Sequence, residues 1–149
     1  MNEFPKRLRR QLKNMTSQQK KESMLKYREA VRETERLENE MRRWRSRAEK
    51  VTAALKMTPS GGPGSRSLED AVDCIDALAV QLGAAQRRAV DLRRGIEAAI
   101  NQVEDGRLRE LLRRRYIDGD TWESIAVKMD YSYMHVCRLH GDALAALKM

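Results

Sequence analysis

The chain has 149 residues, of which 41% are hydrophobic, 35% charged and only 5% aromatic. This length suits one domain or two small ones, and it is short for an enzyme that joins a cofactor-binding domain to a substrate domain. Lys and Arg number 30 against 22 Asp and Glu, a net charge of +8 that favours an acidic partner such as nucleic acid. No apolar run approaches the ~18 residues of a membrane span, so a membrane-spanning role is excluded.

Residues 1–20 are predicted to be a basic N-terminal arm, with six Lys and Arg against one Glu. Five of these cations lie close together without an acidic neighbour: Lys6, Arg7, Arg9, Arg10 and Lys13. They are candidates for contacts to DNA phosphates, and the alternative is a solvated tail. The arm also lacks the apolar stretch of a secretory signal, which predicts a cytoplasmic protein.

Residues 21–104 contain two long helical patterns separated by a loop rich in Gly and Pro. Thr58–Ser65 hold three glycines and two prolines, which end any helix, and we place the loop at 58–66. Ser67 is the predicted N-cap of the second helix. Apolar residues recur at three- and four-residue steps from Met24 to Leu55 and again from Leu68 to Val103, as in a coiled coil.

Folding the two helices antiparallel about this loop places large residues opposite small ones, as close packing requires. The facing pairs are Leu37 with Ala85, Thr34 with Ala89, Val51 with Ala71, Ala48 with Ile75, and Met24 with Ala99. The pattern therefore predicts a long antiparallel helical hairpin within an all-α fold. The same seam is compatible with helices that pair between chains of a homo-oligomer. In a hairpin, the basic arm lies beside whatever follows residue 104.

Residues 105–149 carry three short helical segments, and their spacing matches a three-helix helix-turn-helix domain. Thr121 and Ser132 are the predicted N-caps of the second and third segments. Six apolar residues stand where this unit needs them: Ile125, Ala126, Met129, Tyr131, Val136 and Leu139. Asp130 holds the turn position that takes a left-handed backbone, which Asp tolerates better than most residues. A small helical cap or oligomerisation unit with the same spacing is the alternative.

If this unit reads DNA, the third segment enters the major groove and its exposed face contacts base edges. The candidate base-reading residues are Tyr133, Met134, His135, Cys137 and Arg138, and Arg138 is the only strong reader among them. Candidate phosphate contacts are Thr121 and Ser132 at helix N-termini, together with Arg113, Arg114, Arg115 and Lys128. The three consecutive arginines point around a helix, so not all of them can face one duplex.

Residues 111–126 (LLRRRYIDGDTWESIA) and 130–144 (DYSYMHVCRLHGDAL) resemble the helix-turn-helix of sigma-70 region 4. They are similar in particular to its use in small phage and prophage transcriptional regulators of the ArpU/RinA type, and the resemblance covers most of residues 25–147. It implies sequence-specific control of phage late genes in the cytoplasm of a bacterial host, with double-stranded DNA as partner and RNA polymerase as a candidate partner. Sigma recognition helices carry several Arg and Glu where this chain has Tyr133, Met134 and Cys137. The promoter sequence that sigma factors read is therefore not carried over.

The remaining residue patterns do not predict a disulfide, a metal site or a catalytic site. Cys74 and Cys137 have no CxxC spacing, and only Cys137 and His140 stand at i,i+3, so we expect neither a disulfide framework nor a metal site. No catalytic triad or phosphate-cradling glycine loop is present, so we expect no enzyme and no cofactor.

Two other functions remain open. One is the small terminase subunit of phage DNA packaging, which also joins a helix-turn-helix to helical oligomerisation segments and would assemble as rings of about eight or more chains. The other is a protein adaptor that binds RNA polymerase without DNA, which the near-neutral charge of residues 105–149 favours.

Overall fold

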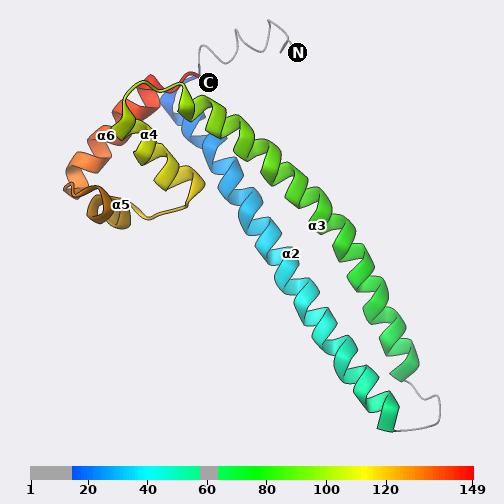
Figure 1. Cartoon of the computed structure of the whole chain (residues 1–149). Helices are drawn as coiled ribbons and strands as arrows, with labels where there is room; N and C mark the ends of the chain where they lie inside the picture. Colours follow the sequence, from blue (N-terminus) through cyan, green and yellow to red (C-terminus); the bar gives the residue numbers. More distant parts are fainter. Residues whose placement is uncertain (1–14, 58–63) are drawn as a thin grey trace, which may run out of the picture. The chain divides into compact units, whose positions relative to one another are not determined.

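A computed structural model describes residues 15–57 and 64–149, and all regular structure within these ranges is helical (Figure 1). Two long helices come first, α2 (Ser17–Met57) and α3 (Gly64–Asn101), and they form a helical hairpin. Four short elements follow: α4 (Gly106–Leu112), the π-helical segment η1 (Arg113–Ile117), α5 (Trp122–Met129) and α6 (Tyr133–Ala146). The all-α prediction is confirmed. The five clustered cations of the basic arm and most of the Gly/Pro loop lie outside the described residues.

Both long helices begin earlier than the sequence pattern suggested. The Thr16 hydroxyl accepts a hydrogen bond from the Gln19 backbone N–H at 3.3 Å, and Gln19 Oε1 accepts one from the Thr16 N–H at 2.9 Å. This reciprocal pair is a capping box, and it starts α2 within the predicted arm. Helix α3 begins at Gly64, so Ser67 lies inside the helix and its assignment as N-cap was wrong. Residues 64–66 contain no proline, and nothing in them prevents helix formation.

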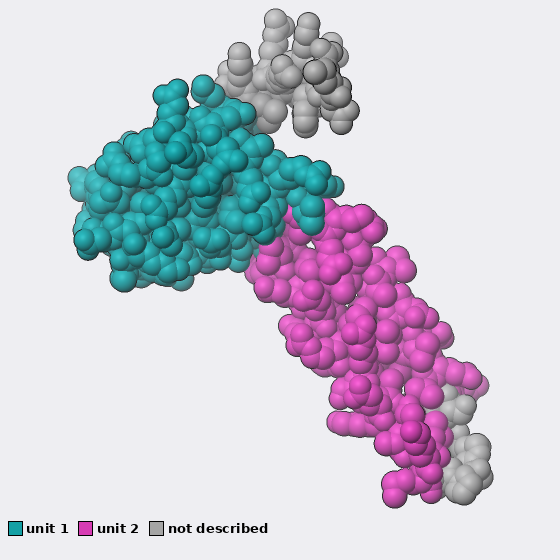
Figure 2. Space-filling model, in the orientation of Figure 1, with its two compact units in different colours: residues 1–29, 90–149 teal, residues 30–89 magenta. Residues whose placement is uncertain are grey.

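The chain divides into two compact units, residues 1–29 with 90–149 and residues 30–89 (Figure 2). The base of the hairpin thus belongs with the C-terminal helices, and the boundary expected between residues 104 and 105 does not coincide with this division. Hydrogen bonds show the reason. Lys20 Nζ donates to the Leu144 carbonyl at 2.9 Å, and the Arg28 guanidinium donates to the Ile117 carbonyl at 3.0 Å.

The unit of residues 30–89 is held by apolar contacts between α2 and α3. Leu37 and Met41 of α2 and Leu78 of α3 are buried together. Four half-buried side chains pack against this cluster: Trp44, Ile75, Leu82 and Ala85. The members come from the segments that the antiparallel register places opposite each other, which supports that register within one chain.

The unit of residues 1–29 and 90–149 has a core of its own, to which several helices contribute. The largest side chains below 2% exposure are Met24, Ile100, Leu111, Leu112, Tyr116, Ile125, Val136 and Leu147. They come from the hairpin base and from each of the C-terminal helices, so these elements share one apolar interior. Fully burying one such aliphatic side chain contributes roughly 1.5–3 kcal/mol to stability.

Candidate nucleic-acid interface

Helices α5 and α6 are joined by a tight turn whose caps follow the sequence prediction. The Thr121 hydroxyl accepts a hydrogen bond from the Ser124 N–H at 3.2 Å, and the Ser132 hydroxyl accepts one from the His135 N–H at 3.2 Å. Between them Asp130 has φ 56° and ψ 46°, the left-handed conformation. The predicted caps and the predicted left-handed turn residue are therefore confirmed.

The residues expected to hold the two helices together are the buried ones. Ile125 and Val136 are fully buried, and Ala126 and Leu139 retain only 8% and 6% of their exposed surface. Small Ala126 lets α6 approach α5 closely, as the helix-turn-helix arrangement requires. The remaining two of the six apolar positions, Met129 and Tyr131, are half-buried.

The outward face of α6 carries four of the five candidate base readers. Tyr133 is 47% and Met134 68% exposed, and Cys137 and Arg138 are exposed as well. His135 differs, because it is half-buried and its ring meets that of Tyr131 edge-on with centroids 4.6 Å apart. Within the described residues no hydrogen bond or ion pair engages Arg138. Its guanidinium is therefore the one cation on this face that is available to a ligand.

The pKa of Tyr133 is shifted by Cys137, which lies one helical turn further along α6. The Cys137 thiol, together with partial desolvation, raises the pKa of the Tyr133 phenol above its ordinary value. A phenol is already protonated at neutral pH at its ordinary pKa, so this upward shift leaves Tyr133 a hydrogen-bond donor.

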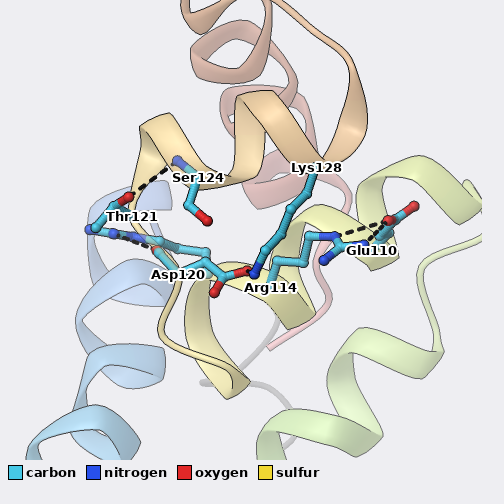
Figure 3. A network of polar contacts seen from close by, with 7 residues as sticks. Glu110, Arg114, Asp120, Thr121, Ser124 and Lys128 are labelled. Carbon is cyan, nitrogen blue, oxygen red and sulfur yellow. Dashed lines mark hydrogen bonds and ion pairs between the residues drawn. The ribbon is translucent and has the colours of Figure 1, made fainter.

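The predicted phosphate-contacting cations within residues 105–149 already have partners in their own unit. Two of them form ion pairs, Arg114 with Glu110 and Lys128 with Asp120, each at 2.8 Å (Figure 3). Arg113 donates to the Asn101 side chain, while Arg115 donates to the Asp120 carbonyl at 3.0 Å and lies over the Trp122 ring at 4.4 Å. One member of each ion pair is partly buried, with side-chain exposures of 28% for Arg114 and 16% for Asp120, so these pairs hold their cations more firmly than fully exposed pairs do. Arg115 is instead fixed between the end of η1 and the start of α5.

A cluster that the sequence analysis did not identify lies behind this surface. Tyr116 of η1 is fully buried, and its hydroxyl is 2.7 Å from His140 Nε2 of α6. The Trp122 ring meets the His140 ring edge-on, with centroids 4.6 Å apart. Burial raises the pKa of Tyr116 to about 12, whereas burial and the cations Lys21 and Arg115 lower the pKa of His140 to about 4. The sequence indicated His140 only as a neighbour of Cys137, whereas the structure makes it a half-buried, neutral residue that packs against Tyr116 and Trp122.

The turn between η1 and α5 is also in contact with Arg28 of α2, a contact that the sequence did not predict. Gly119 has φ 77°, and a Cβ atom there would collide with the Arg28 guanidinium of α2. The Asp-Gly-Asp triplet signalled the turn, but no local pattern linked it to Arg28. Together these contacts seat the start of α5 on the hairpin base, and with it the turn that presents α6.

Other features bear on what the chain binds. Within residues 15–57 and 64–149, no group of three or more His, Cys, Asp or Glu side chains is arranged to hold a metal ion. None of the helices in these ranges combines the length and apolar character needed to cross a bilayer. Comparisons with protein-family models, curated proteins and solved structures find no match for this chain.

Proposed function

We propose that the chain is a DNA-binding transcriptional regulator that inserts α6 into the major groove. The main support for this proposal is the α5–turn–α6 unit, in which the two helices cross through buried residues and have capped N-termini. The unit presents one exposed face of α6, on which Arg138 is the single arginine without a partner among the described residues. A rigidly seated helix with an outward polar face is what direct readout of base edges requires. The proposal further includes that the regulator controls phage genes and acts through RNA polymerase.

Each part of the unit has a distinct role in the proposal. The N–H groups at the starts of α5 and α6 receive phosphate oxygens, because helix N-termini favour anions. Arg138 donates two hydrogen bonds to a guanine, while Tyr133 packs against a base or sugar. Arg113 and Lys128, both exposed, exchange their present partners for phosphates and attract any sequence alike.

The test begins with selection of bound duplexes from a random library by the full chain, which supplies a specific site. The Arg138→Ala variant is expected to bind that site at least about tenfold more weakly while its affinity for random DNA stays nearly unchanged, because a bidentate contact to guanine contributes roughly 1–3 kcal/mol of discrimination. Lys128→Ala is the matched control, since a lost phosphate contact weakens binding to both duplexes equally.

Circular dichroism separates lost recognition from lost folding. Leu139→Ala, which opens the buried helix crossing, provides the reference for an unfolded unit. If folded Arg138→Ala loses specific and random affinity by equal factors, α6 does not read bases through this residue.

A protein adaptor is the second candidate, and a specific observation favours it. Val127 on α5 is 82% exposed, and Met134 and Tyr133 on α6 are 68% and 47% exposed. Large apolar side chains on adjoining helices suit a protein surface better than a phosphate backbone. Binding of the full chain to RNA polymerase that survives Arg138→Ala but is lost in Val127→Asp, with no selected DNA site, would identify the adaptor.

A further inference from the structure

The outer face of α3 in the unit of residues 30–89 is apolar at its centre. Val80 is two residues from both Leu78 and Leu82, so its side chain lies about 200° around the helix from the seam that packs on α2. Val80 is 74% exposed, and exposed Ala77 and Ala84 stand beside it on the same face. Small side chains around one branched residue allow another helix to approach closely.

Acidic and basic residues lie on opposite sides of Val80 along this face. Asp73 and Asp76 lie on its N-terminal side, and Arg87 and Arg88 lie on its C-terminal side. All four are exposed, and among the described residues none of them forms an ion pair or hydrogen bond with another side chain. Asp73 and Arg87 are each seven residues, about two helical turns, from Val80, whereas Asp76 lies four residues and Arg88 eight residues from it.

We propose that this face is a homodimer interface, in which α3 of a second copy packs antiparallel across Val80 on a twofold axis. An antiparallel pairing places the acidic end of each copy against the basic end of the other, Asp73 facing Arg87 twice. A parallel pairing would instead set acid against acid and base against base. A face that is complementary to itself is the requirement of a twofold interface.

The charged residues around Val80, and not Val80 itself, indicate that the partner on this face is a second copy of the chain. A single exposed valine is ordinary on a protein surface and by itself implies no partner. Helices that cross at about 20–50° separate beyond roughly two turns from the crossing point, so Asp73 and Arg87 mark the two edges of the contact. The proposal concerns only residues 73–88 and is independent of whether the chain binds DNA.

Sedimentation of the full chain over a range of concentrations tests the proposal. We expect a monomer–dimer equilibrium that shifts toward monomer as salt is raised, because the paired charges are screened. Arg87→Asp with Arg88→Asp makes the face wholly acidic and should weaken the dimer at least about tenfold, and Asp73→Arg with Asp76→Arg should do the same with a basic face. An equimolar mixture of the two variants should restore dimers, since each face then meets its opposite.

Arg45→Asp with Lys50→Asp is the matched control, because it reverses two exposed cations on α2 and should leave the dimer unchanged. Cross-linking tests the orientation in a background with Cys74→Ser and Cys137→Ser. The Val80→Cys variant should form an interchain disulfide. Ala84→Cys should not, because antiparallel copies hold that position about 12 Å apart, too far for a disulfide.

Three results would overturn the proposal: a chain that stays monomeric at high micromolar concentration, a ring of about eight or more copies, or a dimer that the charge reversals leave intact. Equal cross-linking at positions 80 and 84 would contradict the antiparallel arrangement. Circular dichroism of each variant confirms that the hairpin remains helical.

Discussion

Gly119 shows how one residue answers two requirements at once. Its φ of 77° belongs to the region that L side chains rarely adopt, and the Arg28 guanidinium occupies the space that a Cβ would need. Arg28 in turn donates to the Ile117 carbonyl, one of the acceptors left unpaired where η1 ends. The absence of a side chain at position 119 therefore permits both the left-handed turn and the hydrogen bond that Arg28 of α2 donates.

Replacing Gly119 with Ala is expected to lower the free energy of unfolding by about 1–3 kcal/mol, through backbone strain and the displaced Arg28. Urea denaturation followed by circular dichroism measures the change. Gly95→Ala is the matched control, because Gly95 lies within α3 with nothing within 4 Å of an added Cβ. That substitution should raise stability by about 0.5–1 kcal/mol. Equal effects at the two positions would remove any special role for Gly119.

Sequence reasoning succeeded at single residues where the chemistry was local. Thr121, Asp130 and Ser132 were assigned correctly because caps and left-handed turns depend on residues within a few positions. Arg28 escaped notice because it reaches a carbonyl 89 residues away, and nothing near either residue records that contact.

At the scale of elements, His140 joins three segments into one packed unit. It contacts Tyr116 of η1 and Trp122 of α5 from its own place on α6. The imidazole is neutral at ordinary pH, since its pKa is lowered to about 4 from 6.5. Protonation would therefore place a charge between two aromatic rings and near Lys21 and Arg115.

The stability of this packed unit should fall as the pH decreases from about 6.5 to about 4. The unfolded chain takes up a proton on His140 near pH 6.5, but the folded chain resists it until about pH 4, so the unfolded state binds more protons in this window. The loss is on the order of 2 kcal/mol after allowance for partial exposure of the ring. Below pH 4 this contribution is constant.

Comparing the wild type with His140→Gln isolates the effect of His140, because Gln accepts a hydrogen bond from Tyr116 without titrating. The two proteins contain the same Asp and Glu residues, so the titration of these carboxylates cancels in the comparison. Urea midpoints at pH 7 and pH 4.5 should move further in the wild type than in the variant. Parallel shifts in the two proteins would mean that His140 ionises normally in the folded state.

Element types were predictable from periodicity, but element ends were not. The three- and four-residue spacing indicated both long helices, and the buried Leu37, Met41 and Leu78 bear it out. The early starts of α2 and α3 differ from prediction because Thr16 and Gln19 form a capping box and Gly64 is tolerated in a first turn. The π-helical turn at Arg113–Ile117 has no sequence signature, since its wider hydrogen bonding, as from Asp118 N–H to the Arg113 carbonyl, follows from tertiary packing.

At the scale of the whole molecule, the net charge of +8 is concentrated toward the N-terminus. Deleting residues 1–14, which hold five cations, should weaken DNA binding at every sequence and lower the slope of log affinity against log salt by up to about 4. The cut spares Thr16 and Lys20, so the capping box and the Leu144 contact are retained. A titration over salt concentrations measures the slope, and an unchanged slope would identify the arm as a solvated tail.

The division into two compact units has no signal in the sequence, because a continuous helix carries no break in its periodicity. Both α2 and α3 pass from one compact unit into the other, between residues 29 and 30 and between residues 89 and 90. The division reflects which partners each turn meets, and those partners are distant in sequence. Composition shifts marked only the Gly/Pro loop.

The hydrogen bond from Lys20 to the Leu144 carbonyl spans 124 residues, nearly the whole chain. At about 5–20 residues per second, the first turns of α2 are therefore synthesised about 6–25 s before their last partner. Met24, which is fully buried in the finished protein, spends part of this interval without its complete surroundings. The packing at the base of the hairpin is thus completed only after α6 has been synthesised.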